Sequence, residues 1–141
     1  MTLEGAGDTP LIPGSWGELL DKISILEIKA VRIVAPQALA NVQRELALLV
    51  SLMQPIQSHE SFGAWQAALR KVNQRLWDIE DQLRKKERDQ VFDDEFIALA
   101  RAVYLTNDER AGIKRTINVS LGSQIVEEKQ YATYRREPPA T

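Results

Sequence analysis

The stretch "YLTNDERAGIKRTIN" (residues 104–118) decides how the rest of the sequence is interpreted. A helix can pass through it, but the positions of its expected apolar stripe carry polar side chains. These side chains are Asn107, Arg110, Lys114 and Asn118. On a helix that turns about 100° per residue, the first three fall within about 40° of Val103. The stretch therefore predicts a helix that points polar groups toward the interior of the protein.

The length and composition predict one globular domain. The chain has 141 residues, of which 44% are hydrophobic and 27% are charged, enough to bury a core without metal or disulfide staples. Residues 1–14, rich in Gly and Pro, are predicted to form a flexible arm. Residues 15–131 are predicted to form the single domain, and residues 132–141 a disordered tail.

Charge and residue usage argue against several classes of protein. The net charge of −2 is unlike the basic excess of nucleic-acid-binding proteins. No apolar run reaches the roughly 20 residues that a membrane span needs. The absence of cysteine excludes thiolate metal sites and disulfides, and the acidic residues suit helix capping better than a metal site. We expect no metal, no cofactor, no nucleic acid and no membrane contact, and a cytoplasmic location because no secretory leader is present.

Helix signals divide the sequence into four segments. "SWGE" is a capping box that begins the first helix at Ser15, and its apolar residues alternate three and four apart in a heptad-like seam. Pro36 suits the first turn of a second helix, and Pro55 ends it. The third helix begins near Phe62 and keeps the same seam to Leu83.

The fourth helix has clear signals at both ends. Asp93 is placed to cap its start, with Phe92 and Ile97 as a hydrophobic staple. Gly122 is placed for the left-handed position that ends it. "SQIVEEKQY" after the glycine is expected to pack back on the helices. The predicted fold is therefore all-α, an antiparallel bundle of about four helices.

A second set of apolar residues predicts a homodimer. Ile25 and Ile28 lie opposite the main seam of the first helix, and Leu48 and Leu52 lie away from the seam of the second. Helices that are apolar on more than one side are usually buried on more than one side. Since a short chain has few surfaces to cover them, a two-fold interface is expected.

Polar residues on three helices point to one interior site. The candidate ligand-binding residues are Glu27, Asn73, Glu80, Arg84, Asn107, Arg110 and Lys114. One interpretation is an internal network in which Glu27 and Glu80 pair with Arg110 and Lys114. A second is a pocket for a small anion, clamped by the cations and oriented by the amides. In a third interpretation, the helices are spread apart and water reaches these side chains.

Four segments resemble a bacterial family of short helical proteins of unknown function. They are "GELLDKISILEIK" (17–29), "LWDIEDQLRKKE" (76–87), "YLTNDERAGIKRTIN" (104–118) and "GSQIVEEKQY" (122–131). The resemblance implies a stand-alone bacterial cytosolic domain whose characteristic polar positions are Glu27, Glu80, Asn107, Arg110 and Lys114 here. Ser24 and Val119–Ser120 depart from that pattern, where Thr and a Leu or Thr pair would be expected.

A weaker resemblance is to the helical chorismate mutases, which hold a dicarboxylate among basic and acidic side chains inside a helical dimer. Their first-helix arginine clamp has no match, because Lys22, Lys29 and Arg32 are predicted on the outer face. The sequence thus favours a dimeric module that binds a protein partner or a small anion. The alternative is a metal-free, mutase-like or lyase-like enzyme for an anionic metabolite, with Glu27 or Glu80 as acid or base.

Overall fold

The computed structural model describes residues 9–134, and this part of the chain contains four α-helices, one short 3-10 helix and no strand. The elements are α1 (Trp16–Arg32), α2 (Pro36–Val50), η1 (Ser51–Ile56), α3 (Phe62–Arg88) and α4 (Asp94–Leu121). The predicted all-α class is confirmed. Most of the predicted arm and tail, residues 1–8 and 135–141, lies outside the described residues.

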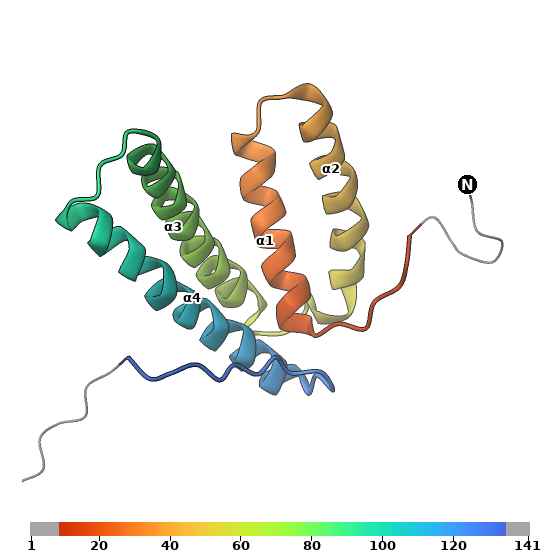
Figure 1. Ribbon diagram of the computed structural model, residues 1–141. Coiled ribbons are helices and arrows are strands. Elements are labelled where there is room, and N and C mark those ends of the chain that lie inside the picture. Colours follow the sequence, from red (N-terminus) through yellow and green to blue (C-terminus); the bar gives the residue numbers. More distant parts are fainter. Residues whose placement is uncertain (1–8, 135–141) are drawn as a thin grey trace, which may run out of the picture.

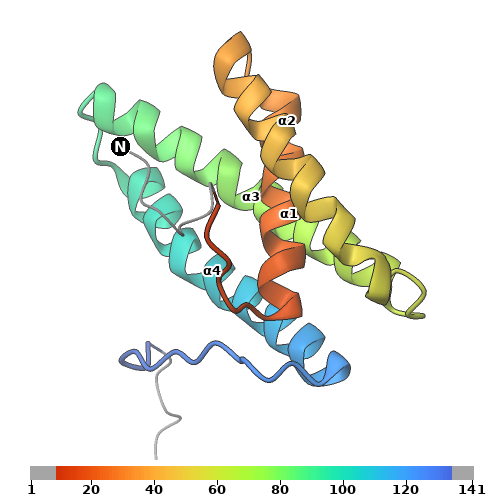
Figure 2. The same ribbon diagram turned by 90° about the vertical axis from the view of Figure 1, so that its right-hand side faces the viewer.

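Helix α1 is central to the arrangement. It packs against α2 on one side and against both α3 and α4 on the other (Figure 1). The view turned by 90° also places α1 between α2 and the other two helices (Figure 2). Helices α3 and α4 lie side by side, and the ends that their turn connects extend away from α1 (Figure 1). The central helix therefore has two faces to bury.

The predicted helix ends are set by local hydrogen bonds. The Ser15 Oγ accepts from the Glu18 backbone N–H at 3.2 Å, and Asp93 Oδ1 accepts from the Phe96 N–H at 2.9 Å. Pro36 is the first residue of α2, and Gly122 ends α4 with a φ of 65°. These four predictions are confirmed because each depends on residues within one helical turn.

Two local predictions need correction or refinement. Helix α2 ends at Val50, before Pro55, which lies inside η1; the chain tightens there because proline cannot continue an α-helical ladder. The Phe92 ring meets the Phe96 ring edge to face with centroids 5.2 Å apart. Ile97 remains 55% exposed, so the ring pair replaces the expected staple as the contact at this helix start.

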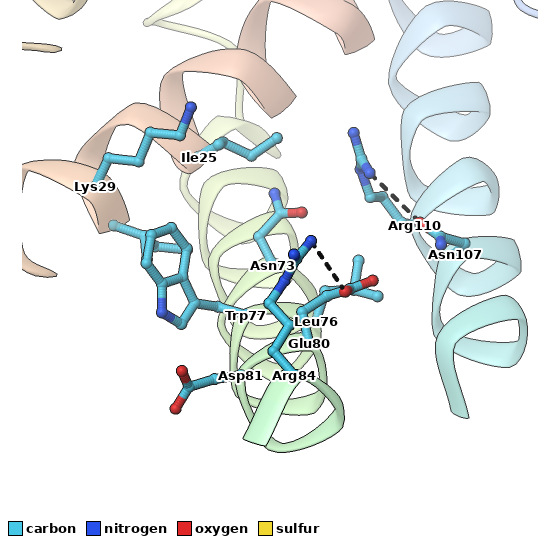
Figure 3. Close-up of a pocket in the computed structure, with 11 residues that line it drawn as sticks. Ile25, Lys29, Asn73, Leu76, Trp77, Glu80, Asp81, Arg84, Asn107 and Arg110 are labelled. Atoms are coloured by element: carbon cyan, nitrogen blue, oxygen red, sulfur yellow. Dashed lines mark hydrogen bonds and ion pairs between the residues drawn. The ribbon is translucent and has the colours of Figure 1, made fainter. Parts of the chain in front are cut away.

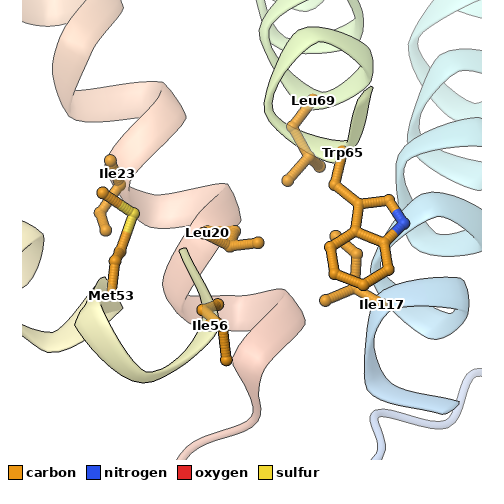
Figure 4. Packing of buried hydrophobic residues seen from close by; sticks show 7 residues of the cluster. All are labelled: Leu20, Ile23, Met53, Ile56, Trp65, Leu69 and Ile117. Carbon is orange, nitrogen blue, oxygen red and sulfur yellow. The ribbon is translucent and has the colours of Figure 1, made fainter. Parts of the chain in front are cut away.

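The hydrophobic core lies where the start of α1, η1, the start of α3 and the end of α4 meet (Figure 4). Its buried members are Leu20, Ile23, Met53, Ile56, Trp65, Leu69 and Ile117. Leu69 and Ile117 have no exposed surface. Burial of each such side chain contributes roughly 1.5–3 kcal/mol. This cluster therefore holds η1, α3 and α4 against α1.

The second face of α1 is buried inside the chain. Ile28 is 2% exposed and Asp21 is 1% exposed, although both lie about 140–160° around the helix from Ile23. Helices α3 and α4 cover this face. The predicted dimer contact through Ile28 is therefore wrong, since the protein's own helices already bury it.

Helix α1 approaches α4 closely at Gly17. Its backbone N–H donates to Asn118 Oδ1 at 2.7 Å. A Cβ atom at this position would lie 2.6 Å from the backbone oxygen of Lys114 and 2.9 Å from Asn118 Oδ1. Only glycine allows this crossing, because a helix backbone atom cannot move aside as a flexible side chain can.

We expect Gly17→Ala to lower the free energy of unfolding by about 1–3 kcal/mol, the usual cost of overpacking a close contact. Urea unfolding followed by circular dichroism measures this change. Gly112→Ala in α4 is the matched control, since a Cβ there meets no atom within 4 Å. The control should be neutral or more stable by up to about 1 kcal/mol, and equal effects of the two substitutions would contradict the crossing argument.

Candidate functional site

The Asp21 carboxylate joins three helices in the interior. It accepts from Arg110 of α4, with Nε at 3.0 Å from Oδ1 and Nη2 at 2.5 Å from Oδ2. Asn73 of α3 donates from Nδ2 to Oδ1 at 2.9 Å. Burying a carboxylate costs several kcal/mol unless it is paired and hydrogen-bonded, and paired N–H donors from one guanidinium are the strongest such partners. The bond to Asp21 raises the pKa of Arg110.

Lys114 is the second buried cation of the network. It is 7% exposed, and its Nζ lies 2.8 Å from Glu18 Oε2 and 2.8 Å from Glu127 Oε2. The same Nζ lies 3.8 Å from Asp21 Oδ2. Burial alone would lower the pKa of Lys114, but the hydrogen bonds to Glu127 and Glu18 outweigh it and raise that pKa. Its charge is thus fully compensated.

The segment after Gly122 packs back along α4, as predicted. Ser123 Oγ accepts from the Trp16 backbone N–H at 3.2 Å and donates to Asn118 Oδ1 at 3.3 Å. Further along, the Tyr134 hydroxyl donates to Asp108 at 2.6 Å. The bond to Lys114 lowers the pKa of Glu127 on this segment. The first turn of α1 is therefore fixed by residues near the opposite end of the described chain.

A pocket of about 480 Å³ opens beside this network, between α1, α3 and α4 (Figure 3). Its apolar wall is formed by Ile25, Ile28, Leu76 and Trp77. Its polar lining consists of Lys29, Asn73, Glu80, Asp81, Arg84, Asn107 and Arg110. The volume suits a small organic molecule, since such pockets usually measure roughly 300–1,000 Å³.

Five of the seven predicted site residues line this one pocket. They are Asn73, Glu80, Arg84, Asn107 and Arg110. Glu27 does not join them: it pairs with Arg70 at 2.8 Å and lines a separate cavity of about 420 Å³ on the other side of α1 and α3. Lys114 lies in the buried network and does not line the pocket. The structure therefore contains both a network and a pocket, which share Arg110 and Asn73.

The predicted acidic partners were wrong. Glu80 contacts Arg84, one turn along α3, at 3.8 Å, while the partner of Arg110 is Asp21. Asp21 was missed because it lies about 160° from the apolar stripe of α1, on the face that was assigned to a dimer contact. The neighbouring Ile25 and Ile28, assigned to a dimer contact, were the available signal that this face is buried.

Lys29 lines the pocket, although its position in the sequence predicted the outer face of α1. It is half-buried. Within residues 9–134 it forms no ion pair, whereas every other cation of the lining has an acidic side chain within 4.0 Å. Lys29 is thus the cation of this pocket whose charge is uncompensated.

The fold and site define a class of small helical domain with a buried ion network beside an open polar pocket. The chain belongs to a family of unknown function, DUF6165, whose model matches residues 12–141. No curated protein and no solved structure matches the chain. Over residues 9–134, no helix is both long and apolar enough to cross a membrane, and no three His, Asp or Glu side chains are grouped to hold a metal ion.

A double-mutant cycle tests the Asp21–Arg110 pair. Arg110→Met leaves the Asp21 carboxylate without its main partner, so we expect a loss of roughly 3–5 kcal/mol in the free energy of unfolding. Adding Asp21→Asn should recover most of that loss, because the remaining groups are neutral. Adding Glu80→Gln instead should recover nothing. Unfolding in guanidinium chloride measures the stability of the single mutant and of both double mutants. Equal rescue by Glu80→Gln would contradict the pairing of Arg110 with Asp21.

Proposed function

We propose that the pocket between α1, α3 and α4 binds a small anionic ligand. The observation that carries the proposal is that Lys29, which forms no ion pair within residues 9–134, lines the same pocket as the apolar side chains Ile25, Ile28, Leu76 and Trp77. A charged group beside apolar surface has fewer contacts with water than one in open solvent. A bound anion replaces the missing water contacts with charge-assisted hydrogen bonds. The pocket then combines one attractive charge with surface for an apolar ligand body.

The charges around the pocket favour a ligand with one negative charge. Glu80 faces Arg84, Asp81 pairs with Lys85 at 3.0 Å, and Arg110 is balanced by Asp21. One positive charge, that of Lys29, remains. A monoanion balances it, whereas a dianion would leave a negative charge beside Glu80.

The enzyme alternative has weaker support. An acid or base at neutral pH needs a carboxyl group shielded from water, because burial is what brings its pKa toward neutrality. The side chains of Glu27 and Glu80 are 35% and 46% exposed, and Glu27 lines a different cavity. The geometry therefore supports binding better than catalysis.

We expect Lys29→Gln to abolish ligand binding without loss of stability, because Lys29 has no ion pair to lose. At about 100 times the dissociation constant, a ligand adds about 2.7 kcal/mol to the stability of the wild-type protein, a rise of several degrees in Tm. A thermal-shift screen with small carboxylates and inorganic phosphate measures this. Lys71→Gln is the control, since Lys71 is exposed and lines the other cavity. A wild-type protein that none of these anions stabilises would contradict the proposal.

We further propose that two copies of this antiparallel bundle form a homodimer through α2 and η1. Leu48 and Leu52 are 59% and 53% exposed, and their spacing places them on one side of the chain. Burying such neighbouring leucines against a second copy removes apolar surface from water. A bacterial, cytoplasmic setting is part of the proposal as well, and rests on the sequence resemblance.

Light scattering should give a mass of twice 15.9 kDa for the wild type. Leu48→Gln combined with Leu52→Gln should give the monomer mass. Val119→Gln is the control, because Val119 is also exposed, at 69%, but lies on α4. A wild-type monomer at all micromolar concentrations would contradict the dimer.

A further inference from the structure

All three tyrosines of the protein line one cavity. A volume of about 780 Å³, here named the tyrosine pocket, is lined by Tyr104 of α4 and by Tyr131 and Tyr134 of the segment after Gly122. The rings of Tyr104 and Tyr134 are tilted against each other, with centroids 5.4 Å apart. None of the three belongs to the core, since Tyr104, Tyr131 and Tyr134 are 42%, 81% and 46% exposed. The tyrosine pocket is therefore aromatic and open to solvent.

The path of the segment after Gly122 leaves room for this cavity. Glu128 lies 3.1 Å from Arg115, and the Tyr134 hydroxyl donates to Asp108 at 2.6 Å, so the segment is attached to α4 at two places. Arg115 and Asp108 are seven positions apart in the helix, a rise of roughly 10 Å. The six residues that follow Glu128 can span roughly 20 Å of extended chain. The segment is thus longer than the distance it bridges, and its residues 129–134 form one wall of the tyrosine pocket.

The N-terminal arm carries an exposed apolar pair between two prolines. In "TPLIPG" (residues 9–14), Leu11 is 98% exposed and Ile12 is 82% exposed, and the segment contains neither helix nor strand. Each proline fixes its own φ near −65° and biases the residue before it toward extended conformations. Because a polyproline II helix repeats every three residues, Pro10 and Pro13 fall on the same side of it.

The arm and the tyrosine pocket are chemically complementary. Polyproline II segments with two prolines three residues apart bind to surfaces lined by aromatic side chains. Flat rings pack against the proline rings, and hydroxyl groups can donate to the backbone carbonyls, which have no partner within a polyproline II helix. The segment is already extended before it binds, so ordering it loses little conformational entropy. The protein thus contains both a segment of this kind and an aromatic pocket.

The arm of the same chain is badly placed for this pocket. Gly17 lies against Asn118, and residues 104–108 are ten to fourteen positions away from Asn118 on α4, roughly 15–21 Å along the helix. Leu11, six residues before Gly17, can reach at most roughly 20 Å when the chain is fully extended. Figure 1 shows residues 9–14 leaving the start of α1 on the side opposite the middle of α4. A second molecule can supply the arm without this stretching.

We propose that the tyrosine pocket binds residues 9–14 of a second copy of this chain. Pro10 and Pro13 pack against the tyrosine rings, and Leu11 and Ile12 lose exposed surface in the contact. Two copies that exchange arms in this way satisfy two-fold symmetry. The inference goes beyond the proposed anion binding and is separate from the contact proposed for α2.

The arm contact alone is weak. A segment of six residues buries less than the roughly 800 Å² per partner of a standard interface. The double variant Leu48→Gln with Leu52→Gln, which lacks the contact proposed for α2, should therefore stay monomeric at micromolar concentrations. At millimolar concentrations the same variant should exchange arms.

NMR on a mixture of two labelled populations of this double variant identifies the chain that supplies the arm. The protein has no cysteine, so Thr9→Cys accepts a single spin label next to Pro10. Spin-labelled chains are mixed with isotope-labelled chains at millimolar concentration. We expect the isotope-labelled chains to lose amide signal intensity at residues 129–134, and the loss should grow with concentration because association follows mass action. Residues 36–42, at the start of α2, should keep their intensity.

The outcomes separate this inference from the other proposals. A signal loss seen only when one chain carries both labels, and absent from the mixture, would mean that the arm binds its own chain, and would overturn the exchange. No signal loss near the tyrosine pocket in either sample would overturn the pocket as the binding site of the arm. Both results would leave anion binding intact, because that function is tested with small acids at the pocket of Lys29.

Two pairs of variants locate the contact on each chain. In the isotope-labelled chains, Tyr131→Ala should weaken the exchange about tenfold, as the loss of an aromatic anchor does. Ile125→Ala is its control, because Ile125 is exposed on the same segment but does not line the pocket. In the spin-labelled chains, Pro10→Ala with Pro13→Ala should weaken the exchange, whereas Val34→Gln, at another exposed position, should not. Equal exchange by Tyr131→Ala and Ile125→Ala would overturn the role of the tyrosine rings.

Discussion

The buried carboxylate of Asp21 is the constraint on which the rest of the arrangement depends. At 1% exposure it cannot be solvated, so its oxygens must be satisfied by side chains. Arg110 and Asn73 supply those bonds from α4 and α3, which fixes how both helices sit against α1. Both residues also line the pocket, so the structural network also shapes the candidate ligand site.

Much of the helical framework could be predicted from the sequence, because its signals act over short distances. Ser15, Asp93 and Gly122 each form their capping contacts within one turn of the helix they begin or end. The inward polar face of α4 was predicted correctly as well: Lys114 and Asn118 are 7% and 2% exposed. Charged side chains at the positions of an apolar stripe are rare enough to indicate a buried, compensated group.

The pairing of these groups could not be predicted, because it depends on which face of α1 meets which helix. One apolar stripe was taken as the buried face, and Asp21 lies on the other. Since α1 is covered on two sides, the face opposite its main apolar stripe is buried as well, and an acidic residue there is part of the interior. Five members of the pocket were nevertheless identified, because all five lie on α3 and α4, whose inward faces the sequence pattern indicated.

The hydrogen bonds at the start of α1 also bear on how the protein folds as it is made. The Gly17 and Trp16 amides are satisfied by Asn118 and Ser123, which follow 101 and 107 positions later. At about 5–20 residues per second, a ribosome needs roughly 5–20 s to supply those partners. The first turn of α1 in the nascent chain therefore waits for the end of α4, while α1 with α2, and α3 with α4, can pair through contacts closer in sequence.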